Sequence, residues 1–183
     1  MKALVVVDMQ NDFITGKLGS KEAQALLPKV VEFVKNFDGG VYYTKDIHHK
    51  TNLGVKEIEK FGFHCMLRSQ GFDIPEELQM VLNDKNAKCY YKNTFMPAFE
   101  FDKQDLLTDL CGQRASEIYV IGVTTDICIL NTALWIRNGL DRRNVIVLKD
   151  LCVGTSKELH EKALDVMKSN VIEIKESRDV ING

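Results

Sequence analysis

The sequence predicts an α/β fold of three layers, in which helices cover both faces of a doubly wound, mainly parallel sheet of six strands. Short runs rich in valine and isoleucine, with no polar alternation, are typical of strands that are buried on both faces of a parallel sheet. Between these runs lie segments whose apolar residues recur every three to four positions, as they do in amphipathic helices. Strands that alternate with such helices favour crossover connections and therefore a parallel order.

Strands are expected at six places along the chain. The first is Lys2–Val7, which Asp8 ends. The other five are Val41–Thr44, Lys88–Tyr91, Glu117–Ile121, Asn144–Leu148 and Val171–Ile174.

Helices are expected between most of these strands. The clearest runs from Glu22 to Phe37, because its apolar residues share one helical face and two glycines follow it. Further helices are predicted over Asp102–Cys111, over Cys128–Asn138 and after a capping box formed by Thr155 and Glu158. Residues 45–64 show no clear period, and a connection of this length in a compact domain is typically functional.

Composition limits the class of protein. No linker or repeat divides residues 1–183, so we expect a single domain, which should bury about 70% of the surface of its unfolded chain. The net charge of −2 argues against nucleic-acid binding, and the longest weakly charged stretch, 118–136, contains too many polar residues for a membrane span. Five scattered cysteines without a Cys-x-x-Cys pair indicate free thiols and a cytoplasmic location.

Ionisable side chains follow four of the predicted strands. Asp8 ends the first strand, Asp46 and His48 follow the second, Lys92 follows the third, and Gly122–Cys128 follows the fourth. In open parallel sheets the active site lies beyond the carboxyl ends of the strands. The sequence therefore predicts that these groups meet at one edge of the sheet. A nucleotide-binding Rossmann site is not expected, because no Gly-x-Gly-x-x-Gly follows the first strand.

Five motifs carry a resemblance to a known family. They are Val7-Asp8-Met9-Gln10-Asn11-Asp12-Phe13, Asp46-x-His48, His64-Cys65 with Gly71 downstream, Lys92-x-x-Phe95 and Gly122-Val123-Thr124-Thr125-Asp126-Ile127-Cys128. Together they resemble the cysteine hydrolases of the isochorismatase-like superfamily, and within it the nicotinamidases (pyrazinamidases). The resemblance implies a catalytic triad of Asp8, Lys92 and Cys128. It also implies an oxyanion hole made by the backbone N–H groups of Thr124 and Cys128, with a cis peptide bond before Thr124.

The chemistry of these residues agrees with the implied triad. A cysteine that opens a helix is favoured as a thiolate by the helix dipole, and an ammonium at Lys92 would lower the thiol pKa further. Asp8 could take the thiol proton and return it to departing ammonia. The other four cysteines are interpreted as buried or inert thiols, and His160 is interpreted as a structural residue of the last helix.

The predicted metal site holds one divalent ion. Asp46 and His48 lie on the same side of an extended segment, which suits chelation, and the resemblance adds His64 and Glu57 as ligands. Carboxylates and imidazoles suit zinc, which we expect first, and also manganese or ferrous iron. The sequence departs from the common family pattern at Ile47 and His49, where a tryptophan and a proline are usual.

The resemblance implies that the metal binds a pyridine nitrogen and that Phe13 and Phe61 form apolar walls around the ring, with Phe95 as a third candidate. The predicted function is hydrolysis of nicotinamide, and of pyrazinamide, through a thioester on Cys128, as part of NAD salvage. The partner is then a small aromatic amide; a homo-oligomer is left open. The alternatives are hydrolysis of an N-carbamoyl amide or a vinyl ether by a related enzyme, or a catalytically silent α/β binding protein.

Overall fold

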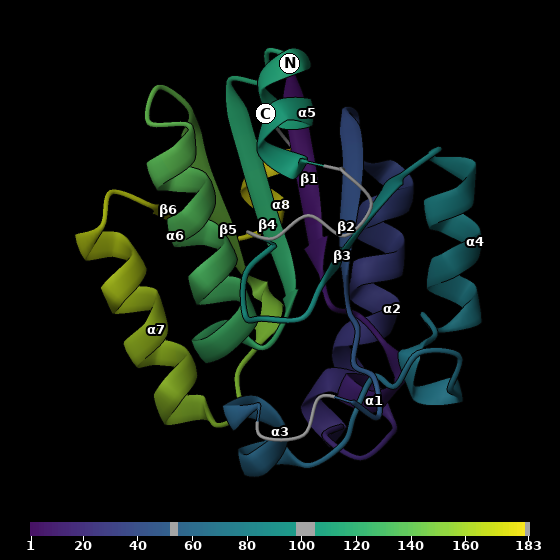
Figure 1. Cartoon of the computed structure of the whole chain (residues 1–183). Coiled ribbons are helices and arrows are strands. Elements are labelled where there is room, and N and C mark those ends of the chain that lie inside the picture. Colours follow the sequence, from purple (N-terminus) through teal and green to yellow (C-terminus); the bar gives the residue numbers. More distant parts are fainter. Residues whose placement is uncertain (52–54, 98–104, 182–183) are drawn as a thin grey trace.

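The computed structural model describes residues 1–51, 55–97 and 105–181. Its centre is a six-stranded sheet (Figure 1). The strands are β1 (Lys2–Val7), β2 (Gly40–Asp46), β3 (Lys88–Lys92), β4 (Glu117–Val123), β5 (Asn144–Val153) and β6 (Glu173–Lys175). They lie in the order β3-β2-β1-β4-β5-β6, and every neighbouring pair is parallel. This arrangement confirms the predicted fold class.

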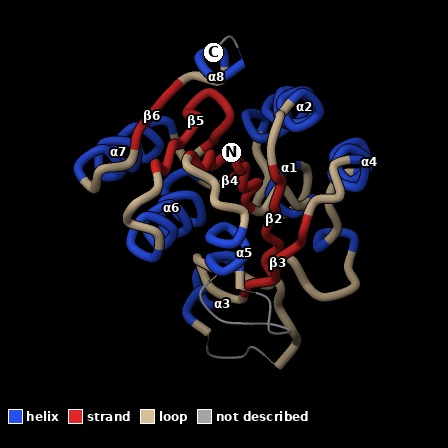
Figure 2. The backbone as a smooth tube through the Cα atoms, turned by 90° about the horizontal axis from the view of Figure 1, so that it is seen from above, coloured by secondary structure: helices blue, strands red, loops and turns tan. Residues whose placement is uncertain are grey.

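Helices cover both faces of the sheet, as Figure 2 shows from above. One face carries α2 (Lys21–Asn36) and α4 (Glu76–Asp84), and the other carries α5 (Leu106–Gly112), α6 (Leu130–Gly139) and α7 (Lys157–Ser169). The cause is the alternation of side chains along each strand. In β1, Val5 packs into the core under α5, α6 and α7, whereas Leu4 and Val6 pack into the core under α2 and α4.

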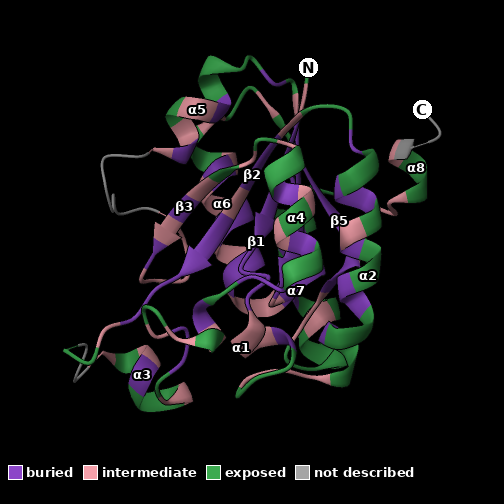
Figure 3. Cartoon of the chain, turned by 90° about the vertical axis from the view of Figure 1, so that its right-hand side faces the viewer, coloured by how far each residue is buried: buried purple, intermediate pink, exposed green. Residues whose placement is uncertain are grey.

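The remaining helical segments are short. They are α1 (Asn11–Ile14), α3 (Lys56–Phe61), the 3₁₀ turn η1 (Gln70–Phe72), the π turn η2 (Thr125–Ile129) and α8 (Arg178–Ile181). Both α1 and α3 lie beyond the carboxyl ends of the strands, at the lower edge in Figure 1. The inner strands β1, β2 and β4 are mostly buried between the two helical layers, whereas β3 at the edge of the sheet is only partly buried (Figure 3). No helix in the described ranges is long and apolar enough to cross a membrane.

Several predicted element boundaries are wrong. The sequence predicts no helix where α4 lies, and it ends the fifth strand at Leu148, whereas β5 continues to Val153. Cys152, which lies beyond the predicted end of that strand, is therefore a buried residue of β5. The helix expected to begin at Asp102 begins at Leu106, and 98–104 lie outside the described residues.

The predicted capping box before α7 is also wrong. Ser156, rather than Thr155, is the N-cap, because its side chain accepts a hydrogen bond from the Leu159 N–H. Thr155 instead donates two hydrogen bonds to the carboxylate of Asp126, which lies in η2. The N-cap thus lies one residue later than predicted. Because Thr155 does not cap α7, it is available to hydrogen-bond η2.

The end of α7 supports a prediction about stability. Ile172 N–H donates to the Met167 carbonyl and Val171 N–H donates to the Lys168 carbonyl, both at 3.1 Å, which is a Schellman motif. Val171 occupies the left-handed position, with φ of 63°, and the residue is 71% exposed, so its side chain contributes little to the core. A β-branched residue is unfavourable there, so we expect Val171→Gly to raise the free energy of unfolding by about 1 kcal/mol. Denaturant unfolding measures this. Val171→Ala is the control, since it keeps the Cβ, and an equal gain in both variants would contradict the explanation.

Candidate active site

Three of the predicted site residues form a buried cluster at the carboxyl edge of the sheet. Lys92 Nζ lies 2.7 Å from Asp8 Oδ2 and 3.6 Å from Cys128 Sγ. Asp8 directly follows β1, Lys92 ends β3, and Cys128 lies in η2 after β4. The side chains of Asp8 and Lys92 are almost wholly shielded from solvent. The structure thus brings together a carboxylate, an ammonium and a thiol, the groups of the predicted triad.

Asp8 is held in place by its backbone and by Thr44 of β2. Its φ of 50° lies in the left-handed region, which turns its side chain out of the regular alternation of β1. Thr44 Oγ1 donates a hydrogen bond to Asp8 Oδ1 at 2.7 Å and accepts one from the Asp8 N–H at 3.2 Å. The first bond holds one carboxylate oxygen, and the second ties the Asp8 backbone to Thr44. The other carboxylate oxygen faces Lys92.

Gln10 hydrogen-bonds the segment after β1 to Asp46 at the end of β2. Its Nε2 donates to the carbonyls of Asp46 and Phe72 at 2.9 Å, and its Oε1 accepts from the Asp46 N–H at 2.7 Å. Neither Gln10 nor Thr44 is among the predicted site residues. The only sequence signal for Gln10 is its position within the motif that follows the first strand.

The pKa values in this cluster differ from the expected pattern. Burial raises the pKa of the Cys128 thiol well above its ordinary value, although the nearby Lys92 ammonium lowers it. Burial also raises the pKa of Asp8, against the opposing effect of Lys92. Burial thus favours a resting thiol at Cys128 over the expected thiolate. A thiol there lies beside a carboxylate that can take its proton.

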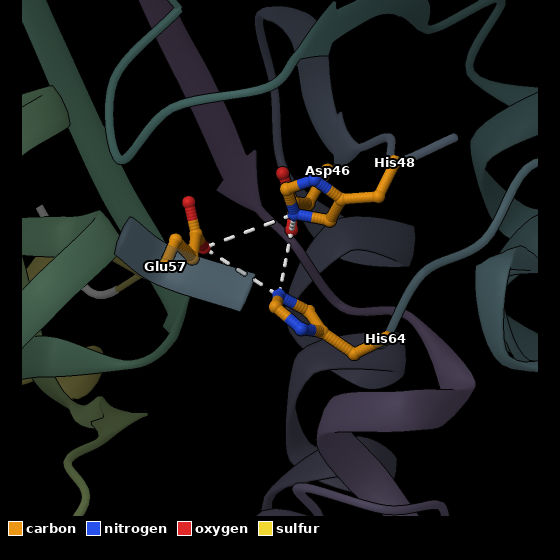
Figure 4. A group of neighbouring side chains, drawn as sticks. All are labelled: Asp46, His48, Glu57 and His64. Carbon is orange, nitrogen blue, oxygen red and sulfur yellow. Dashed lines mark hydrogen bonds and ion pairs between the residues drawn. The ribbon is translucent and has the colours of Figure 1, made fainter. Parts of the chain in front are cut away.

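Four side chains from three segments converge beside this cluster (Figure 4). Asp46, His48, Glu57 and His64 each offer one ligand atom, and these atoms all lie within 4.8 Å of one another. Asp46 Oδ2 lies 2.9 Å from His48 Nε2 and 3.1 Å from His64 Nε2. Glu57 Oε1 lies 3.9 Å and 3.5 Å from the same two nitrogens. Glu57, expected on a loop, lies in α3.

The donor set fits a divalent ion. Two imidazole nitrogens and two carboxylate oxygens are ligands that zinc accepts, and manganese and ferrous iron accept them too. His64 Nδ1 contacts the Gly62 carbonyl at 2.8 Å, the kind of second contact that orients a ligating imidazole. Burial lowers the pKa of His64, but the contacts with Asp46 and Glu57 outweigh it and raise the pKa to about 10. The cluster therefore favours a positive charge at its centre, which a metal ion would also supply.

A cavity of about 200 Å³ connects the two clusters. Its lining includes Cys128 and Thr124 on one side and Glu57 and His64 on another. All three predicted aromatic residues also line it: Phe13, Phe61 and Phe95. This volume is smaller than that of pockets for drug-sized ligands, so it suits a molecule with a single ring.

The segment around the thiol has two notable features. The peptide bond between Val123 and Thr124 is cis, as the resemblance implies. Cys128 lies in the π turn η2 and precedes α6, which begins at Leu130, so the expectation that Cys128 opens the α-helix is wrong by two residues. Thr124 and Cys128, whose N–H groups are the predicted oxyanion donors, both line the cavity.

Comparisons with known proteins agree with this geometry. Residues 2–179 match the isochorismatase domain family. The chain is 30% identical over 190 residues to the nicotinamidase/pyrazinamidase of Mycobacterium tuberculosis, which covers 95% of this chain and 98% of that protein. It is 27% identical over 215 residues to the nicotinamidase of Schizosaccharomyces pombe, covering 98% of this chain and 94% of that protein.

A solved structure with the same fold is that of the pyrazinamidase of Pyrococcus horikoshii in complex with zinc. It is 29% identical, with a TM-score of 0.78, over 96% of this chain and 98% of that chain. The resemblance that the motifs predict is thus confirmed across the whole sheet and both helical layers. Because the family match covers nearly every residue, this chain belongs to the isochorismatase domain family.

Proposed function

We propose that this protein is a metal-dependent cysteine amidase that hydrolyses nicotinamide, and also pyrazinamide, to the corresponding acid and ammonia. One observation carries the proposal: two members of the four-residue cluster, Glu57 and His64, line the same small, aromatic-walled cavity as Cys128. The relatives reported above are named nicotinamidases and pyrazinamidases, which supports this substrate class.

The acylation step uses the side chains of the triad. Asp8 takes the proton of the Cys128 thiol while Sγ attacks the carboxamide carbon, and Lys92 stabilises the negative charge that develops on sulfur. The carbonyl π electrons move to oxygen, and the N–H groups of Thr124 and Cys128 are the donors for this oxyanion. Asp8 then returns the proton to the amide nitrogen, the C–N bond breaks, and ammonia leaves a thioester on Cys128.

Deacylation repeats the same steps of proton removal, addition and bond cleavage, with water as the nucleophile. Asp8 takes a proton from water and the hydroxide adds to the thioester carbon. The C–S bond then breaks as Asp8 returns the proton to Sγ, which releases the acid and restores the Cys128 thiol. The raised pKa of Asp8 suits a group that must alternate between base and acid.

The metal ligands orient the substrate. Asp46, His48, Glu57 and His64 would hold one divalent ion, which would supply a Lewis-acid anchor for the ring nitrogen of a pyridine. Phe13 and Phe61 make edge contacts with His64, at ring-centroid distances of 5.5 Å and 6.5 Å, and so adjoin the place where that ring would lie. We propose zinc as the ion, with manganese and ferrous iron as the alternatives.

The alternative functions fit this site less well. Hydrolysis of an N-carbamoyl amide or a vinyl ether gives no role to a cluster of four metal-ligating side chains, two of which line the cavity. A silent binding protein gives no role to a buried ammonium placed 2.7 Å from a carboxylate and 3.6 Å from a thiol. Burial of such charged groups is costly, and functional sites are where it is commonly found.

Ammonia release tests the proposed function. We expect the metal-loaded protein to release ammonia from nicotinamide, and to lose this activity after chelation and recover it when zinc, manganese or iron is restored. Benzamide is the matched comparison because it lacks only the ring nitrogen, so its hydrolysis should be much slower. Equal turnover of both amides, or full activity after verified metal removal, would overturn the assignment.

Glu57 provides a prediction about the metal. Whether it binds the ion directly or through a water, Glu57→Gln should weaken metal retention by about 10- to 100-fold and should raise KM more than it lowers kcat. Metal content after dialysis measures the first effect. Glu59→Gln on the same helix is the control, since Glu59 pairs with Lys56 at the surface. If Glu57→Gln retains metal as tightly as the Glu59 variant does, Glu57 is not a ligand.

A further inference from the structure

The turn that carries Cys128 is fastened to α7 by two side-chain contacts outside the triad. Thr125 Oγ1 lies 2.8 Å from His160 Nδ1. The Asp126 carboxylate accepts hydrogen bonds from the Thr155 N–H at 2.8 Å and from the Thr155 hydroxyl at 2.5 Å. We call these four residues the η2 clasp. It joins consecutive residues of η2 to α7 and to the loop before it.

The packing around the clasp leaves little free space. Thr125 is fully buried. A Cβ added at Gly154 would lie 2.9 Å from both Asp126 Oδ1 and His160 Cβ, so a side chain there would push η2 and α7 apart. The close approach of the two elements therefore depends on this glycine.

The protonation state of His160 suits the contact with Thr125. Burial lowers the pKa of His160, although Glu161 and Asp126 oppose this effect. The ring is therefore neutral near neutral pH. With its proton on Nε2, Nδ1 accepts a hydrogen bond from the Thr125 hydroxyl, which leaves this buried hydroxyl satisfied.

Two residues of the clasp, Thr125 and Asp126, lie in the sequence between the two oxyanion donors of the proposed mechanism. Thr125 and Asp126 are the first two residues after Thr124, and Cys128 follows two residues later. Thr124 and Cys128 line the cavity, whereas Thr125 and Asp126 make their side-chain contacts with His160 and Thr155. A shift of η2 relative to α7 would thus move the donors relative to each other.

We propose that His160 and Thr125 are positioning residues that hold the N–H groups of Thr124 and Cys128 at the spacing the oxyanion requires. This inference rests on the proposed amidase function. Donors stabilise a transition state only when they are already in place, and catalytic groups must be held to within about 0.5 Å by the residues around them. His160, expected to have only a structural role, thereby acts on the reaction through Thr125.

Steady-state kinetics provide the first test. Thr125→Val and His160→Ala should each lower kcat by about 10- to 100-fold, as loss of a supporting contact does at other sites, with KM unchanged. Thr125→Ser, which keeps the hydroxyl, and His160→Asn, which places an amide where Nδ1 lies, should each recover most of the loss. The double variant should lose no more than the worse single variant, because both changes remove one contact.

Two further measurements separate positioning from a general loss of structure. Alkylation of Cys128 by iodoacetamide forms no oxyanion, so its rate should not change in the variants. Pyridine-3-carbaldehyde forms one: Sγ adds to the carbonyl carbon, the π electrons move to oxygen, and the thiol proton passes to Asp8. Its affinity should fall by the same factor as kcat, while the affinity for nicotinate, which needs no addition, stays constant.

The outcomes are distinct. Lys162→Ala is the control on α7, because Lys162 is 66% exposed and pairs with Glu158 away from η2. Unchanged kcat in Thr125→Val and His160→Ala, or alkylation that falls in parallel with kcat, would overturn the proposal. If His160→Ala does not fold, the comparison of Thr125→Val with Thr125→Ser decides. Wild-type turnover reports on the amidase function, whereas the aldehyde-to-acid affinity ratio reports on the clasp and requires no turnover.

Discussion

Cys128→Ala should lower ammonia release from nicotinamide by about 10⁴-fold or more, as removal of a catalytic nucleophile does in other hydrolases. Sγ of Cys128 is the thiol that faces Lys92 at 3.6 Å, and no neighbouring group replaces the thioester that it forms. The change removes one atom from a wall of the cavity and leaves the metal ligands in place. Initial rates of ammonia release measure the effect, with metal content as a check on folding.

The other cysteines provide the control. Cys111 is exposed and Cys152 is buried in β5, and neither lines the cavity. We expect Cys111→Ala and Cys152→Ala to keep most of the activity. Turnover by Cys128→Ala at the wild-type rate would contradict the mechanism.

Asp8→Asn should slow the reaction by about 10²- to 10⁴-fold, the range typical of a lost general acid–base. The amide keeps the size of the carboxylate, and its oxygen can still accept from Thr44, so the geometry around Thr44 Oγ1 is preserved. It cannot take the thiol proton or return it to ammonia. Values of kcat for nicotinamide measure the loss.

Lys92→Met complements this change because it removes the ammonium that lowers the pKa of the Cys128 thiol. Alkylation by iodoacetamide near neutral pH should then be slower than in the wild type. The kinetic effects of the two variants should be strongly non-additive, since both groups act on one proton transfer. Equal alkylation rates in Lys92→Met and wild type would remove Lys92 from the triad, and additive effects would mean that the two residues act independently.

The fold and most of the site can be predicted from the sequence because the relevant signals are local. A buried parallel strand can be recognised in the sequence as a run of apolar residues. The carboxyl ends of such strands form the edge of the sheet at which active sites lie. Asp8, Asp46 and Lys92 lie at such ends, so their meeting follows from topology alone. The identity of the motifs then assigns a chemistry to the residues that meet.

The features that could not be predicted depend on contacts between residues that lie far apart in the sequence. Thr44 and Gln10 act through hydrogen bonds to residues 36 positions away, which leave no pattern in a sequence window. The extension of β5 depends on pairing of Cys152 with Gly122 after a register shift between β4 and β5. A Cβ at Gly122 would lie 2.2 Å from the Val7 carbonyl oxygen, so the close approach of β4 and β1 needs this glycine.

The protonation state of Cys128 is the clearest case of a local argument that tertiary structure overrides. A cysteine near the start of a helix and close to a lysine is expected to be a thiolate. The complete fold buries Sγ and surrounds it with the carboxylates of Asp8 and Asp46, and these effects outweigh Lys92. Burial depends on every layer of the fold, so no local sequence window could have supplied it.

The central claim is that nicotinamide is hydrolysed through a thioester on Cys128, and capture of that thioester by hydroxylamine tests it most directly. Hydroxylamine is about as small as the ammonia that the cavity must release, and it attacks thioesters to give hydroxamates. The predicted result is nicotinohydroxamate formed at the expense of nicotinate, with ammonia release no slower than in water and no hydroxamate from Cys128→Ala. Nicotinate as the only product at saturating hydroxylamine, or hydroxamate formed equally by Cys128→Ala, would contradict the account.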